Sequence, residues 1–274
     1  MVKISLLITT YNDPYRLKKT LSHYLAQSPQ PGEILVCDDG SRPETKMLVE
    51  SFAKISRIPI IHVYQEDHGW DAPGVRNLGA IKSSGEYLLM TDGDCIPHPG
   101  FIRDHLAAVE KGHFVFGDRS HVLKAYVEEF STNLFVRMDY ILRKKIQKRI
   151  SAVRNPFEKP AIYTKSSFAQ IAPLASLSMA CNFGVWKNDF VAVNGFDESY
   201  HSWWPEDAEC SARLLNSGLK MKKYRQKCLV YHLDHGETSR PCHEEYHFAE
   251  QNLLSGKTKT SNGIEERLKM IQSA

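Results

Sequence analysis

The sequence has no apolar run of about eighteen or more residues, and it therefore predicts no transmembrane helix. Its first segment, MVKISLLITTYND, becomes polar too soon for a signal peptide, so we expect a cytoplasmic protein. The six cysteines form no C-x-x-C pair, and without an export signal we expect reduced thiols. A net charge of only +3 gives no overall positive field, and we expect no nucleic-acid partner.

Two glycine-rich phosphate loops are also missing. Neither G-x-G-x-x-G nor G-x-x-x-x-G-K-[ST] occurs, which disfavours a dinucleotide site and a P-loop. A metal ion or side chains would therefore have to bind any phosphate group. The 274 residues, 42% of them hydrophobic, are enough for one large globular domain.

Strand and helix patterns alternate through the first half of the chain, which predicts an α/β fold with a mainly parallel, Rossmann-like sheet flanked by helices. Apolar runs predict strands at 3–10, 32–41, 58–65 and 85–94, and helices are predicted at 13–25, 43–55 and 74–84. In the first of these helices, Asp13 is the expected cap and Pro14 the expected first helical residue. In such sheets, ligands bind beyond the carboxyl ends of the strands.

The second half is less regular between about 119 and 175 and then returns to recognisable elements. We predict a strand and a helix within 178–198, a helix over 205–218 and a last strand within 227–237. These patterns suggest one domain over 1–240, divided into halves over 1–118 and 119–240. A polar, helix-prone extension over 241–274 follows it.

Polar side chains stand where three of the predicted strands end. Asp92 and Asp94 flank one glycine after the run EYLLMT, and two carboxylates so placed suit Mg²⁺ or Mn²⁺. A solvated D-G-D turn is the plainer alternative. Asp39 could accept a hydrogen bond from a base N–H, while Thr9 and Tyr11 could frame a base or a ribose.

The segment HSWWPEDAE brings two tryptophans next to a Glu-Asp pair. Glu206 and Asp207 at a helix start could simply stabilise the helix, because acidic side chains interact favourably with the positive end of its dipole. Trp203 and Trp204 beside a carboxylate also suit a sugar site, with a flat apolar face for the ring and a base for a hydroxyl.

Other basic residues remain open to more than one interpretation. Arg76 offers a cation for phosphate or for the carboxylates. His232 and His235, after the last strand, are either metal ligands that join Asp94 or ordinary histidines. The basic helix over 137–154 is either a solvated face or a contact with anionic lipid on the inner face of the membrane, or with an acidic acceptor.

Taken together, the chain resembles the family 2 glycosyltransferases with the GT-A (nucleotide-diphospho-sugar transferase) fold. Five segments carry this resemblance in order over about residues 2–236: LLITTYN, ILVCDDGS, GVRNLGA, GEYLLMTDGDC and WWPEDAE. The segment from Cys181 to Gly218 further resembles the C-terminal half of galactosyltransferase and chondroitin-polymerase-type enzymes. A departure is Trp204-Pro205, where relatives place small glycines, and this affects the expected shape of the acceptor pocket.

The resemblance implies that 1–118 is the nucleotide-binding half and 119–240 the acceptor-binding half. It also implies a role for each candidate residue. Thr9, Tyr11 and Asp39 would bind uridine, Arg76 would lie near the diphosphate, and Asp92 would contact the ribose or the metal. Asp94 and one of the histidines, with His232 favoured over His235, would bind Mn²⁺ or Mg²⁺. Asp207 would be the general base, Glu206 would bind the donor or acceptor sugar, and Trp203 or Trp204 would stack on the acceptor.

The implied activity is metal-dependent, inverting transfer of a sugar of the Gal, GalNAc, Glc or GlcNAc type from UDP. The implied acceptor is a glycan or a lipid-linked glycan in surface polysaccharide or lipopolysaccharide synthesis. Two alternatives stay open at this point. A sugar-nucleotide nucleotidyltransferase is disfavoured because TTYNDPYR stands where a glycine-rich loop is expected, and a non-catalytic nucleotide- or glycan-binding protein is the other.

Overall fold

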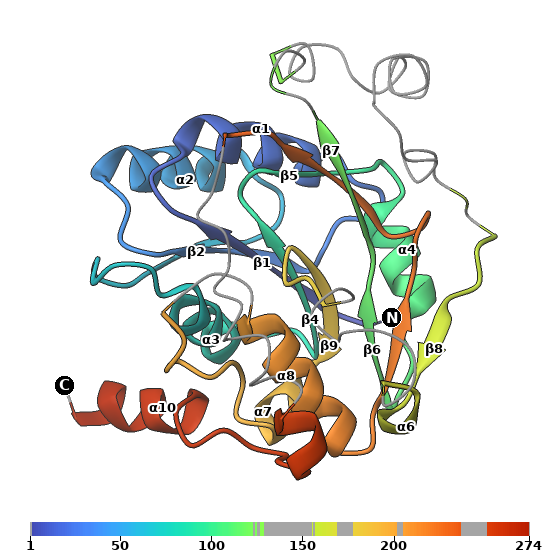
Figure 1. Cartoon of the computed structure of the whole chain (residues 1–274). Coiled ribbons are helices and arrows are strands. Elements are labelled where there is room, and N and C mark those ends of the chain that lie inside the picture. The colour runs from blue at the N-terminus through green and yellow to red at the C-terminus, as the bar shows by residue number, and fades with distance from the viewer. Residues whose placement is uncertain are drawn as a thin grey trace.

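The computed structural model describes residues 2–122, 124, 127–128, 155, 157–168, 178–201, 205–236 and 251–273 (Figure 1). The predicted basic helix over 137–154 lies outside these residues, as do Trp203 and Trp204. Among the described residues, no helix combines the length and the apolar character needed to cross a membrane.

A large central sheet organises the fold. Its strands stand in the order β3-β2-β1-β4-β9-β6-β10-β8. Their bounds are β1 (Ile4–Thr10), β2 (Glu33–Asp38), β3 (Ile60–Tyr64), β4 (Tyr87–Asp92), β6 (His113–Phe116), β8 (Ala161–Tyr163), β9 (Asn182–Trp186) and β10 (Lys220–Lys223).

The strands of this sheet run mainly in one direction. β3, β2, β1 and β4 are parallel neighbours, and β6 and β10 form a further parallel pair. β9 runs antiparallel between β4 and β6, and β8 runs antiparallel along β10. The predicted α/β class with a mainly parallel central sheet is therefore confirmed.

Helices cover both faces of the sheet (Figure 1). One face packs against α1 (Pro14–Leu25), α2 (Pro43–Ile55) and α4 (Phe101–Ala108), and the other against α3 (Ala72–Lys82), α7 (Lys187–Ala192) and α8 (Pro205–Asn216). Along β1, Leu6 and Ile8 face the first set while Leu7 faces the second. Because both faces are buried, the strand has a continuous apolar run instead of an alternating one.

A second, three-stranded sheet places the last strand beside the D-G-D turn. Its order is β5-β11-β7, with β5 (Cys95–Pro97), β7 (Asp118–Val122) and β11 (Leu229–Leu233). His232 stands opposite Cys95 in the register, and the backbone N–H of Leu233 donates to the carbonyl of Asp94 at 2.9 Å. These contacts bring residues that are far apart in the sequence to one strand end.

Local signals place the starts of the helices that border the site. Asp13 accepts a hydrogen bond from the Arg16 N–H at 3.0 Å, and Pro14 opens α1 as predicted. Helix α3 begins at Ala72, before the predicted start at Gly74, because Asp71 accepts from the Gly74 N–H at 2.9 Å. Two further helices are α6 (Lys165–Phe168), which is short, and α10 (Ile264–Ser273), which packs against α3.

Candidate active site

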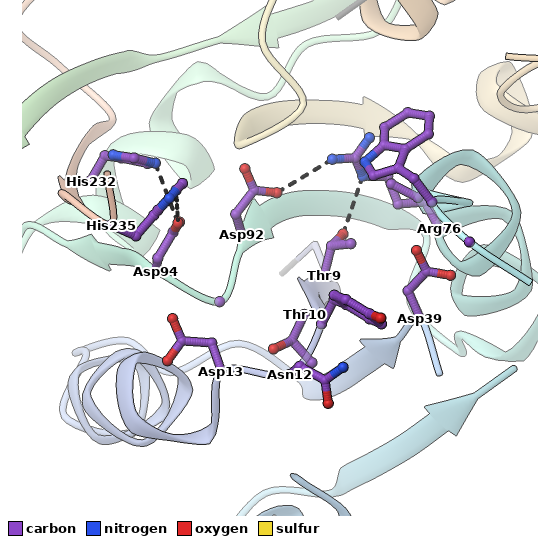
Figure 2. A pocket seen from close by; sticks show the side chains of 15 residues that line it. Thr9, Thr10, Asn12, Asp13, Asp39, Arg76, Asp92, Asp94, His232 and His235 are labelled. Carbon is purple, nitrogen blue, oxygen red and sulfur yellow. Dashed lines mark hydrogen bonds and ion pairs between the residues drawn. The ribbon is translucent and has the colours of Figure 1, made fainter. Parts of the chain in front are cut away.

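The carboxyl ends of β1, β2 and β4 open into a cavity of about 440 Å³ (Figure 2). The structure brings together at this cavity all of the predicted nucleotide- and metal-binding side chains: Thr9, Tyr11, Asp39, Arg76, Asp92, Asp94, His232 and His235. A smaller cavity, with Glu206 and Asp207 in its wall, shares Arg76 and Asp92 with the first. Two chemically different spaces therefore meet at Arg76 and Asp92.

Asp39 forms a buried acceptor at one end of the larger cavity. Its Oδ1 accepts a hydrogen bond from Gln65 Nε2 at 2.6 Å, and its Oδ2 accepts from the Asp71 backbone N–H at 2.9 Å. Burial raises the pKa of Asp39 to about 6, although these hydrogen bonds act in the opposite direction. Tyr11 is 52% exposed, and its hydroxyl donates to Asp67 at 3.1 Å.

Arg76 lies at the boundary between the two cavities and is almost completely buried. Its guanidinium donates to Thr9 Oγ1 at 3.1 Å, to Asp92 Oδ1 at 3.3 Å and to Glu206 Oε1 at 3.1 Å. Burial disfavours its charge, but the surrounding carboxylates, Asp92 first among them, raise the pKa of Arg76 above its usual value. One cation from α3 thus holds carboxylates from β4 and α8 together.

Asp207 lines the smaller cavity from the first turn of α8. Pro205 begins α8, so Glu206 and Asp207 occupy its first turn, where the helix dipole favours acidic side chains. Asp207 Oδ2 accepts from the Ala180 backbone N–H at 2.6 Å, while Oδ1 accepts no hydrogen bond within the described part of the chain. Burial raises the pKa of Asp207, and it raises the pKa of Glu206 to about 8.

Asp94, His232 and His235 form a compact group at the other end of the larger cavity (Figure 2). Asp94 Oδ2 lies 3.3 Å from His232 Nε2 and 3.2 Å from His235 Nε2. Burial opposes ionisation of Asp94, but hydrogen bonds from both imidazoles hold its pKa below its usual range. One carboxylate oxygen and two imidazole nitrogens within 4.8 Å of one another form a donor set that fits Mn²⁺ or a similar divalent ion.

The loop that carries His235 is tied to the start of α1. Arg16 Nη2 donates to the carbonyl of Asp234 at 3.1 Å, and Arg16 Nη1 pairs with Asp13 Oδ2 at 2.5 Å. Asp13 itself lines the larger cavity. Asp13, the cap of α1, therefore also helps to hold the loop that follows β11, through Arg16.

A second possible metal-binding group lies beside Asp92 but has a different electrostatic setting. Asp92, Cys95 and Cys181 come close enough to share an ion. Arg119 Nη1 lies 3.7 Å from Cys181 Sγ, and Arg76 is paired with Asp92. The positive charges of Arg119 and Arg76 would repel a metal ion at this group, so it is less suited to bind one than the group around Asp94.

Several residues of the site were not predicted from the sequence. Gln65 and Asp71 hold Asp39, Asp13 and Arg16 support the histidine loop, and Arg119 lines the smaller cavity. The run Asp71-Ala-Pro is a helix-start signal that could have identified Asp71 as a cap. The partners of Gln65 and Arg119 depend on the tertiary fold and leave no local pattern.

Two family models match consecutive parts of the chain. The model described as glycosyl transferase family 2 matches residues 5–171. The model described as the N-terminal domain of galactosyltransferase matches residues 167–236. The predicted resemblance of the second part to galactosyltransferases is thereby confirmed.

Curated relatives are similar over most of this chain but are longer. Validoxylamine A glucosyltransferase from Streptomyces hygroscopicus subsp. limoneus is 30% identical over 236 residues, which are 81% of this chain and 50% of the relative. Chondroitin synthase from Escherichia coli is 25% identical over 246 residues, 84% of this chain and 34% of the synthase. The chain thus spans half or less of the length of these relatives.

Solved structures share the fold. The crystal structure of GalNAc-T7 with UDP, GalNAc and Mn²⁺ aligns with a TM-score of 0.62 at 15% identity, covering 92% of this chain and 48% of GalNAc-T7. At this level of identity the likeness concerns the fold, and it agrees with the predicted GT-A architecture.

Proposed function

Since the chain belongs to glycosyl transferase family 2, we propose that it is a metal-dependent, inverting glycosyltransferase that uses a UDP-sugar. The observation that carries the proposal is the meeting of two cavities at Arg76 and Asp92. One is lined by Asp39 and by the group of Asp94, His232 and His235, and the other is lined by Asp207. A donor nucleotide and an acceptor hydroxyl need this kind of adjacency, because transfer requires the two reactants side by side.

The donor would lie along the larger cavity. Asp39 would accept the uracil N–H, with Thr9 and Tyr11 beside the base and ribose, and Asp92 near the ribose or the metal. Asp94, His232 and His235 would hold Mn²⁺ or Mg²⁺ at the diphosphate end. Support comes from the donor set and from GalNAc-T7, which shares the fold and was crystallised with UDP, GalNAc and Mn²⁺. The ion would neutralise negative charge on the departing diphosphate.

Asp207 would act as the general base on the acceptor. It would take the proton from a hydroxyl, whose oxygen then bonds to the anomeric carbon from the side opposite the diphosphate. The bond from that carbon to the diphosphate oxygen breaks, UDP leaves with the electron pair, and the configuration inverts. The Oδ1 atom of Asp207, which accepts no hydrogen bond in the described part of the chain, is the oxygen suited to this role.

Glu206 and the tryptophans would complete the sugar-binding surface. Glu206 lines the same cavity as Asp207 and pairs with Arg76, so it would contact a sugar while holding the arginine. Trp203 or Trp204 would stack on the acceptor. We propose as acceptor a glycan or lipid-linked glycan in surface polysaccharide or lipopolysaccharide synthesis, and chondroitin synthase among the relatives supports a polysaccharide.

The test compares Asp207→Asn with Glu44→Gln, a matched change of an exposed acidic residue in the first turn of α2. UDP affinity is measured by calorimetry with Mn²⁺, and transfer is measured as UDP release from a panel of UDP-sugars with glycan acceptors. Asp207→Asn should keep UDP affinity and lose transfer by about 100-fold or more, since a general base contributes that much. Equal loss of binding and transfer, or unchanged transfer, would contradict the role of Asp207.

A further inference from the structure

The C-terminal helix lies beyond both family models and yet reaches the donor side of the site. The family matches end at residue 236, whereas α10 spans Ile264–Ser273. In Figure 1, α10 lies next to α3, the helix that carries Arg76. A segment outside the matched region therefore packs against the element that borders the larger cavity.

Arg267 on α10 makes the contacts that matter for the site. Its Nε and Nη2 atoms donate to the two oxygens of Glu198, each at 2.8 Å, in a forked pair. Its Nη1 donates to Gln65 Oε1 at 3.2 Å, and Nη2 also lies 3.3 Å from Asp71 Oδ2. The Arg267 side chain is only 17% exposed, so these interactions are poorly screened by water.

Gln65 and Asp71 are the two groups that hold the Asp39 carboxylate. Because Gln65 Oε1 accepts from Arg267, its amide nitrogen is turned towards Asp39 Oδ1, to which it donates at 2.6 Å. The backbone N–H of Asp71 donates to Asp39 Oδ2 at 2.9 Å. Both hydrogen bonds that orient Asp39 therefore come from residues in contact with Arg267.

The packing around Arg267 leaves little freedom for another arrangement. A Cβ atom added at Gly74 would collide with Arg267 Nη2 and with the Asp71 carboxylate, so a larger residue there would have to displace both side chains. Glu198 Oε1 also accepts a hydrogen bond from Asn77 Nδ2 at 2.8 Å. The Arg267 side chain thus lies between the start of α3 and the loop after β3, with hydrogen-bond partners around its guanidinium group.

We propose that Arg267 is a positioning residue for the base-binding end of the donor site, acting on Asp39 through Gln65 and Asp71. This inference rests on the proposed function, in which Asp39 binds the pyrimidine of UDP. In this view the C-terminal helix is a working part of the donor site. The alternative is that Arg267 only fastens α10 to α3, in which case its loss would affect stability without affecting recognition of the base.

The experiment separates base recognition from general loosening of the fold. Binding of UDP and of inorganic diphosphate, each with Mn²⁺, is measured by calorimetry for the whole chain and its variants. Arg267→Ala should weaken UDP binding by about tenfold, the effect of one charge-assisted hydrogen bond, and leave diphosphate binding within about twofold. Arg267→Lys keeps the charge without the fork and should fall between Arg267→Ala and the unmodified protein.

Two comparisons serve as controls. Lys269→Ala removes a basic residue from the same helix, one whose side chain is 76% exposed, and should leave both affinities unchanged. In an Asp39→Ala background, Arg267→Ala should have no further effect on UDP binding, because the group that Arg267 positions is already gone.

The outcomes are distinguishable. Equal weakening of UDP and diphosphate, or additive effects of Arg267→Ala and Asp39→Ala, would overturn the positioning role. If Asp39→Ala weakens UDP binding and Arg267→Ala does not, the inference alone is wrong. If Asp39→Ala leaves UDP binding unchanged, the base site of the proposed function is wrong, and the role of Arg267 is wrong with it.

Discussion

Replacement of Arg76 by methionine should be the most informative single change at the site, because it removes a buried charge and keeps an apolar stem of similar length. The methionine can still pack near Phe196, whose ring centroid lies 5.5 Å from the guanidinium carbon. What is lost is the cation shared by Asp92, Glu206 and, at 3.8 Å, Asp207.

The size of the effect follows from opposing contributions. Each charge-assisted hydrogen bond contributes about 1.5–3 kcal/mol, and Arg76 makes two to carboxylates. Against this, the cost of burying the guanidinium disappears and Glu206, whose pKa is raised to about 8 by burial, can bind a proton. We therefore expect the free energy of unfolding to fall by about 3–5 kcal/mol, the usual cost of removing one partner of a buried ion pair.

The deficit should also depend on pH in a definite direction. Without Arg76, the pKa values of the remaining carboxyls rise further above their unfolded-chain values. Stability contributed by such groups is present at low pH and is lost as the pH rises through the raised pKa values, so the deficit should be larger at about pH 8 than at about pH 5. Urea unfolding at both pH values measures it, with the exposed Arg57→Met as the control. A deficit below about 1 kcal/mol, or one that grows on acidification, would refute this reasoning.

Three further predictions concern separate parts of the molecule. UDP affinity should fall as the pH drops below about 6, because the Asp39 carboxylate then gains a proton and accepts from the base N–H more weakly without its charge. In calorimetric titrations, the Asp39→Asn protein should not show this pH dependence. Glu209→Gln should lower the free energy of unfolding by about 3–5 kcal/mol, because it leaves the fully buried Arg213 without its charged partner. Changing both residues to methionine should lower it less, and urea unfolding of the two variants measures the difference. His235→Ala should weaken Mn²⁺ binding by about tenfold or more, as measured by electron paramagnetic resonance, and should leave the folded structure intact by circular dichroism.

Sequence periodicity anticipated most of the elements that frame the site. Because a strand buried on both faces must be apolar throughout, β1, β2 and β4 were visible as continuous runs, and the polar residues that end them marked the strand ends. Caps were equally local: Asp13 with Pro14 marked the start of α1. The order of motifs along the chain then indicated the family.

Contacts between distant residues were decided only by the tertiary fold. Arg76 was predicted near the diphosphate, but its pairing with Glu206, 130 positions away, could not be deduced from spacing. The same holds for the Ala180 N–H on Asp207 and for Arg267, whose partners Gln65 and Asp71 are about two hundred residues away.

The sequence by itself therefore determined which segments become strands and helices, and which chemical groups stand at their ends, because those properties depend on neighbours along the chain. It did not determine which oxygen of Asp207 is left without a hydrogen bond among the described residues, or which residues orient Asp39. These depend on where separate elements dock, and docking is decided by the packing of whole faces, with α10 against α3 as the example that local patterns could not reveal.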